Sequence, residues 1–325
     1  MRRRYLCGAL VGVLAVAGAL TAGWGSSAAR PASTHALSKL SVMRPFGFKQ
    51  RVKPARPTRT NNLSYRGGVG GIGVENAPTV YLVLWGSQWN NNDPSSEASR
   101  LESFFGNAGG SKWLASVTQY CQGVSSGTVF CNGAGTAAGG SVSFSTSGSV
   151  WYDSASAAPS SPTQSQLAAE AVRAAQHFGN TGAGSNNTTQ YVVATATHNN
   201  ASGFGTQYCA WHSSTSSSYG NIAYTNLPYI TDAGASCGAN FNNLGSNAGM
   251  TIVEGHEMAE TITDQYPNGG WLDRNGEENG DKCAWIQSGQ GASASVSMNG
   301  GSFPVQSLWS NAFNNKSGGC VLSYP

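Results

Sequence analysis

Charge is scarce in this sequence and is distributed unevenly. Charged residues make up 10% of the 325 residues, and the first 60 contain eleven Lys or Arg and no acid. The remaining 265 contain seven Lys or Arg against fifteen acids, a formal charge of −8. The net charge of +3 therefore conceals an acidic body, which excludes nucleic acid as a partner.

Apolar runs long enough to cross a membrane are also missing. Three arginines precede the apolar run Leu6–Leu20, which is short and rich in Gly and Ala. This pattern predicts an export signal over residues 1–29 and no stable membrane anchor. Residues 30–60 are basic and contain several prolines, so we interpret them as a disordered linker or a cleaved pro-segment. Residues 61–325 then form a single globular domain.

No Cys-x-x-Cys spacing occurs, which argues against a zinc–thiolate site. Cys7 would leave with the signal, and the six cysteines that remain favour three disulfides in a secreted protein. Fifteen connectivities are open. Because short loops close most easily, we expect pairing between sequence neighbours, namely Cys121–Cys131, Cys209–Cys237 and Cys283–Cys320.

The apolar pattern predicts a mixed α/β fold, one sheet with helices packed on it. Thr79–Trp85 is almost wholly apolar, as in a strand buried on both faces. Helices are expected after Asp93-Pro94, over 112–120, from the N-cap Thr163 to Phe178, and around His256. Further strands are expected at 128–131, 141–152, 191–198 and 221–225.

The most informative segment is Ile252–Asp264, Ile-Val-Glu-Gly-His-Glu-Met-Ala-Glu-Thr-Ile-Thr-Asp. In a helix, His256, Glu257 and Glu260 fall on the stripe that should be buried, while Glu254 points away from it. Buried carboxylates need a cation. His-Glu-x-x-Glu has the geometry of the zinc-protease signature His-Glu-x-x-His, with a carboxylate replacing the second imidazole.

This arrangement predicts a zinc site that is catalytic. His256 and Glu260 would be metal ligands, and Glu257 would act as general base on a metal-bound water. A third ligand is required, and we expect it from the acidic loop 271–283, from Glu278 in preference to Asp281. Asp264 and Asp273 are expected to support the ligands. Two alternatives stay open: a calcium loop built from acids of 273–281, and a metal-free ion-pair network with Arg274 and Lys282.

His212 is the other histidine of interest, because it follows Cys209 by three residues. It is either a structural histidine or a catalytic residue that stabilises an oxyanion.

Several stretches resemble a group of secreted actinobacterial proteins, and more distantly the plant phosphate-induced/exordium extracellular proteins. They are Tyr65–Val69, Pro78–Gly86, Ser161–Glu170, Gly255–Asp264, and Gly270–Asp273 followed by Glu278–Cys283. The resemblance implies export and a zincin-like helix. We therefore expect an exported, monomeric, metal-dependent endopeptidase that acts on extracellular peptide or protein. The alternative is a non-catalytic extracellular or cell-wall interaction protein with a structural metal.

Overall fold

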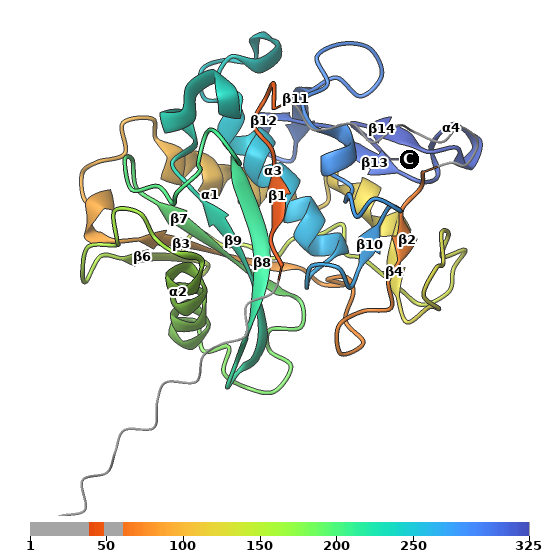
Figure 1. Ribbon diagram of the computed structural model, residues 1–325, viewed down its shortest axis with the longest axis horizontal. Coiled ribbons are helices and arrows are strands. Elements are labelled where there is room, and N and C mark those ends of the chain that lie inside the picture. The colour runs from red at the N-terminus through yellow and green to blue at the C-terminus, as the bar shows by residue number, and fades with distance from the viewer. Residues whose placement is uncertain (1–38, 49–60, 325) are drawn as a thin grey trace, which may run out of the picture. The chain divides into compact units, whose positions relative to one another are not determined.

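The computed structural model describes residues 39–48 and 61–324. Within them, six strands form one mixed sheet in the order β1-β8-β9-β7-β3-β6 (Figure 1). Four of these strands are parallel, whereas β8 runs antiparallel to β9 and β1 antiparallel to β8. The strands of this sheet are β1 (Ser41–Met43), β3 (Thr79–Trp85), β6 (Val150–Asp153), β7 (Thr189–Thr195), β8 (Ala210–Ser217) and β9 (Gly220–Leu227).

The described residues also form four α-helices and five short 3-10 helices. The α-helices are α1 (Glu97–Ala108), α2 (Gln164–His177), α3 (Ala248–Thr263) and α4 (Phe313–Lys316). The 3-10 helices are η1 (Ser87–Trp89), η2 (Leu114–Gln119), η3 (Ile230–Cys237), η4 (Phe241–Asn243) and η5 (Asp281–Cys283). Four two-stranded sheets complete the described part of the chain, pairing β2 (Ser64–Tyr65) with β10 (Trp271–Leu272), β4 (Cys121–Gln122) with β5 (Thr136–Ala137), β11 (Ala294–Met298) with β12 (Gly301–Val305), and β13 (Leu308–Ser310) with β14 (Gly319–Val321).

The sheet is covered on both faces, so the predicted mixed α/β fold is confirmed. Side chains of β3 alternate between two cores, since Leu82 and Leu84 pack with α1 and α3 while Val83 packs with α2. This alternation explains why the strand is apolar along its whole length.

Helix α2 begins and ends where the sequence predicts. The Thr163 hydroxyl accepts a hydrogen bond from the Gln166 backbone N–H, and the Gln166 side chain accepts one from the Thr163 N–H. This reciprocal capping box satisfies two amide groups that would otherwise lack partners. At the other end Phe178 is the C-cap, and Gly179, at φ +76°, follows it.

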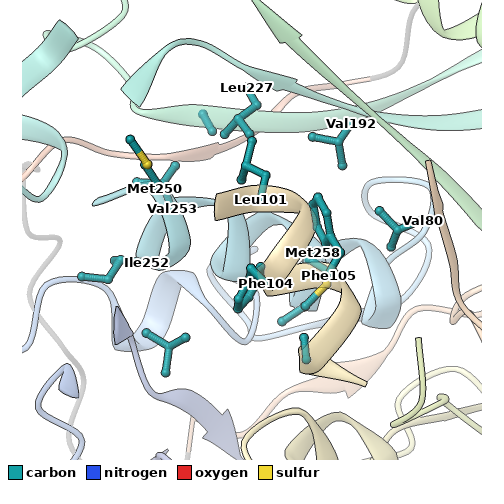
Figure 2. Close-up of a cluster of buried hydrophobic side chains, with 14 of the residues drawn as sticks. Val80, Leu101, Phe104, Phe105, Val192, Leu227, Met250, Ile252, Val253 and Met258 are labelled. Carbon is teal, nitrogen blue, oxygen red and sulfur yellow. The ribbon is translucent and has the colours of Figure 1, made fainter. Parts of the chain in front are cut away.

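Helix α3 is the most enclosed element, with all sixteen of its residues buried. It contacts β8 of the main sheet, helix α1 and strand β12 of the C-terminal region. Figure 2 shows Met250, Ile252, Val253 and Met258 of α3 near Leu101, Phe104 and Phe105 of α1. The prediction of a single buried stripe was therefore incomplete, because Glu254, Met258 and Thr261 on the other side are buried as well.

All three predicted disulfides, Cys121–Cys131, Cys209–Cys237 and Cys283–Cys320, are confirmed. They fit folding in an oxidising compartment. Two predicted strands were wrong. Residues 128–131 form no strand. Of residues 141–152, only the last three belong to β6. A turn, closed by a hydrogen bond from the Gly148 N–H to the Ser145 carbonyl, separates them from an isolated bridge at Ser143.

The linker interpretation of residues 30–60 is wrong for the described residues 39–48. This segment supplies β1, which pairs with β8 at the edge of the main sheet. Strand β1 is only three residues long, which is too short for an alternation of polar and apolar residues to reveal it in the sequence. The predicted signal, residues 1–29, and the rest of 30–60 lie outside the described residues. In the described part of the chain, no helix is long and apolar enough to cross a membrane.

Candidate metal centre

Helix α3 places His256, Glu257 and Glu260 together, as predicted from their spacing. His256 Nε2 lies 3.1 Å from Glu260 Oε1, one helical turn away. The three side chains have ligand atoms within 4.8 Å of one another, close enough to hold one ion. They do not line an exposed concave surface, since all three are fully buried.

Two further ligand candidates reach Glu260 from other elements. His212, on β8, has its Nε2 3.6 Å from Glu260 Oε2 and 3.3 Å from Glu278 Oε2. Glu278 belongs to the loop before η5. Together with His212 and Glu260 it forms a second group whose ligand atoms lie within 4.8 Å of one another. Glu260 thus lies between two imidazoles. We call His212, His256, Glu257, Glu260 and Glu278 the His/Glu cluster.

Gln306 sets the orientation of His256. Its amide nitrogen donates to the carbonyl of Gly280 at 2.8 Å, so its amide oxygen is left to face His256 Nδ1 at 3.3 Å. Nδ1 must then carry a hydrogen and donate it. In a neutral imidazole Nε2 would present a lone pair to the Glu260 carboxylate, which is unfavourable unless a proton or a metal ion lies between them. A histidine that binds a metal usually donates its other ring N–H to a neighbouring oxygen, as His256 Nδ1 does here to Gln306.

The electrostatics of the cluster also call for positive charge at its centre. Burial alone lowers the pKa of His256, but the carboxylates of Glu260 and Glu257 raise it to about 10. Burial alone would raise the pKa of Glu260, but the neighbouring His256 and His212 lower it to about 2. The cluster therefore holds protons on its imidazoles unless a cation replaces them, as happens when a metal binds histidine.

The side chain of Glu257 has no hydrogen-bond partner in the described part of the chain. Both of its carboxylate oxygens are buried and accept no hydrogen bond from any described residue. Burial raises its pKa to about 8, against the opposing effect of His256. Glu254, one turn earlier, is equally buried and unpartnered, and burial and then the charges of Glu257 and Glu97 raise its pKa well above the ordinary range.

The remaining acids predicted for the site have other roles. Asp281 keeps its Oδ1 3.8 Å from His256 Nε2, but its side chain is partly exposed and belongs to neither ligand group, so Glu278 is the better third-ligand candidate. Asp264 accepts the backbone N–H groups of Asn268, Gly269 and Gly270, and so organises the turn after α3. It does not contact the ligands by any hydrogen bond or ion pair among the described residues.

Among the described residues, the acids of 273–281 do not form a metal-ligating group of their own. Asp273 accepts hydrogen bonds from the backbone of Asn275 and Glu277 and pairs with Lys282 at 3.1 Å. Asn275 is exposed, and Glu278 turns into the His/Glu cluster instead. Of the cations named for the ion-pair alternative, Lys282 does pair with Asp273, whereas Arg274 is exposed.

The sequence analysis named His212 in a different role and missed two other contributions to this centre, Gln306 and Gly280. His212 lies beside the ligands, so a ligand role fits its position better than an oxyanion role; its strand is too polar to be recognised by periodicity. Gln306 carries no sequence signal at all. Gly280 is required for space, since a Cβ there would lie 2.7 Å from His256 Nδ1 and 2.9 Å from Glu260 Oε1.

No protein-family model, curated protein or solved structure matches the chain.

Proposed function

We propose that the chain is an exported, metal-dependent hydrolase that cleaves peptide bonds. One observation carries the proposal: two groups of metal-ligating distance, His256–Glu257–Glu260 and His212–Glu260–Glu278, share Glu260, and neither carboxylate oxygen of Glu257 has a hydrogen-bond partner among the described residues. His256, Glu260, His212 and Glu278 would hold the ion, and Glu257 would serve as the base.

Zinc is the cation that these ligands favour. Imidazole nitrogen combined with carboxylate oxygen suits Zn²⁺, whereas Ca²⁺ takes six to eight oxygen ligands. When bound, the ion would polarise a water molecule and the carbonyl group of the substrate.

The residues of this chain would then move the proton. Glu257 adjoins the proposed ligand His256, and both of its carboxylate oxygens lack a hydrogen-bond partner among the described residues, so it is placed to exchange a proton with a water in the site. It takes a proton from the attacking water and delivers it to the leaving amine. The C–N bond breaks, the oxygen of water joins the carbonyl carbon, and the products are a carboxylic acid and an amine.

Export is part of the same proposal. It is supported by the three disulfides and by the basic and then apolar N-terminus of the sequence.

Burial of the centre favours one alternative function. Closed sites with four protein ligands are typical of structural zinc, whereas catalytic sites keep a position open. Every member of the His/Glu cluster is at most 1% exposed. The alternative is therefore a non-catalytic extracellular or cell-wall interaction protein stabilised by its metal.

Metal analysis combined with four substitutions tests the proposal. The protein is stripped with EDTA, reloaded with zinc, and assayed for zinc affinity and for cleavage of casein and of a peptide library. We expect His212→Ala and Glu278→Gln each to weaken zinc binding by at least about tenfold. Glu257→Gln should change the affinity by less than about threefold and abolish cleavage.

Glu277→Gln is the matched control, because Glu277 adjoins Glu278 but lies outside the His/Glu cluster, and it should behave like the unaltered protein. If the protein binds no zinc, or if Glu278→Gln binds it as Glu277→Gln does, the proposed site is wrong. If zinc binds but no substrate is cleaved, the structural alternative is favoured.

A further inference from the structure

Residues 39–46 lie beside the His/Glu cluster, with strand β1 (Ser41–Met43) at their centre and a turn beginning at Phe46. Strand β1 pairs antiparallel with β8 so that Ser41 is opposite His212 and Met43 is opposite Ala210. The Ser41 hydroxyl donates a hydrogen bond to the Glu278 carboxylate. Strand β1 lies next to β8 at the sheet edge and also contacts α3, the two elements that carry the histidines of the cluster (Figure 1). The segment is thus in direct contact with one ligand candidate and paired with another.

The backbone of this segment is held by several separate parts of the body. The Cys209 N–H donates to the Met43 carbonyl at 2.8 Å, and the Trp285 indole donates to the Arg44 carbonyl at 2.6 Å. The Phe46 N–H donates to the Ser236 carbonyl at 2.8 Å. These contacts recognise the main chain and would accept other sequences in the same conformation.

Two side chains of the segment pack against separate parts of the body. Met43 is fully buried in the core. The ring of Phe46 meets Phe241 and Trp285 edge-on, with ring centroids 5.2 and 6.2 Å away, and remains 39% exposed. Main-chain pairing along a sheet edge combined with pockets for particular side chains is how proteins bind extended peptides by strand addition.

Without β1, strand β8 would be the edge of the main sheet, with unpaired N–H and C=O groups beside the cluster. An extended chain could then pair with β8 and bring its own backbone past His212. In the structure this place is already taken, and the cluster is closed to solvent.

We propose that residues 39–46 are an internal inhibitor that occupies the groove for an extended polypeptide substrate, which binds antiparallel to β8. The inference rests on the proposed hydrolase function and names its substrate-binding mode. The groove selects a long apolar side chain at the position of Met43 and an aromatic side chain at the position of Phe46. Because the inhibitor belongs to the same chain, it competes at high effective concentration and keeps the enzyme latent until it is displaced.

Two substitutions that weaken the contact from opposite sides test this proposal in the full-length protein. Met43→Asp puts a charge at a buried position, and Trp285→Ala removes the hydrogen bond to Arg44 and the ring contact with Phe46. Phe48→Asp is the matched control, because it adds the same charge to the same segment at a side chain that is 43% exposed. Disulfide formation, checked by a free-thiol content equal to that of the unaltered protein, and circular dichroism establish that each variant folds.

The first measurement is the rate at which a colorimetric chelator removes zinc. Met43→Asp should accelerate removal by at least about tenfold, given the apolar area that its burial contributes, and Trp285→Ala should also accelerate it. Phe48→Asp should leave the rate unchanged.

The second measurement needs no metal. A fluorescein-labelled peptide with the sequence of residues 39–48 is titrated against each protein in EDTA, and its anisotropy is followed. We expect it to bind Met43→Asp at least about tenfold more tightly than the unaltered protein, in which the groove is filled.

Failures of the two ideas give different results. If folded Met43→Asp releases zinc and binds peptide as the unaltered protein does, residues 39–46 are a permanent part of the fold and the inference is wrong. If Met43→Asp does not fold, unchanged zinc release from Trp285→Ala overturns it. If the protein binds no zinc but the peptide binds Met43→Asp, the groove stands and the hydrolase proposal fails.

Discussion

Gly280→Ala isolates the role of space at the His/Glu cluster. Gly280 has φ −78° and ψ −47°, a conformation that alanine adopts without strain. On backbone grounds alone, the substitution should therefore stabilise the protein by restricting its unfolded state. The side chain reverses that expectation, because its Cβ would lie 2.7 Å from His256 Nδ1 and 2.9 Å from Glu260 Oε1.

Neither neighbour can move away freely. His256 is held by Gln306, and Glu260 accepts the Asp281 backbone N–H at 2.8 Å. Overpacking in such a position costs about 1–3 kcal/mol. In a domain of this size, that lowers the melting temperature by roughly 2–12 °C. If the zinc-bound state is destabilised by the same free energy, zinc affinity drops by about 5- to 150-fold.

The assay is thermal unfolding of the EDTA-treated protein, followed by zinc titration. Gly106→Ala serves as the control, because Gly106 is exposed in the interior of α1 with no atom within 4 Å of an added Cβ. That variant should gain about 0.5–1 kcal/mol in stability. Equal melting temperatures for Gly280→Ala and Gly106→Ala would refute the packing argument.

Two other predictions concern pH and the C-terminal disulfide. Burial raises the pKa of Glu75 from 4.5 to about 8, against the opposing effects of Gln190 and His212. Its folded pKa exceeds its unfolded one, so this carboxyl stabilises the native state fully below pH 4.5 and loses that contribution as pH rises through about 8. Glu75→Gln should flatten the dependence of urea-unfolding free energy on pH between 5 and 8; a slope equal to that of the unaltered protein would contradict this. Replacing both Cys283 and Cys320 by Ala opens a loop of 37 residues, which should cost about 3–4 kcal/mol in the same assay. Because the bridge anchors η5 next to Glu278, zinc affinity should fall too, and a loss of stability with affinity unchanged would show that the loop holds its shape alone.

Local signals made α2, α3 and the disulfides predictable. Thr163 and Gln166 specify the start of α2 within four residues, and the carboxylates of α3 are three to four residues apart. The cysteines pair with their neighbours, for which loop closure is least costly. Each of these features depends on residues that are close in the sequence.

The other half of the centre depends on tertiary contacts that leave no local pattern. Strand β8 reads Ala-Trp-His-Ser-Ser-Thr-Ser-Ser, and six of its eight residues are buried although most are polar. Polar side chains in a sheet interior show no hydrophobic alternation, so the strand and the position of His212 could not be found. Likewise, nothing in the sequence near Gln306 or Ser41 connects either residue with α3.

The enclosure of α3 also has an evolutionary consequence. A helix with an outward face can accumulate neutral substitutions there, and α2 has exposed positions such as Ser165 and Ala169 for such drift. Helix α3 has none, because the sheet, α1 and the C-terminal strands leave all sixteen of its residues buried. Each change in it alters packing or charge in the interior and is open to selection. Over long divergence, 248–263 should therefore persist as an uninterrupted block, while the surrounding loops drift until little else in the chain identifies a relative.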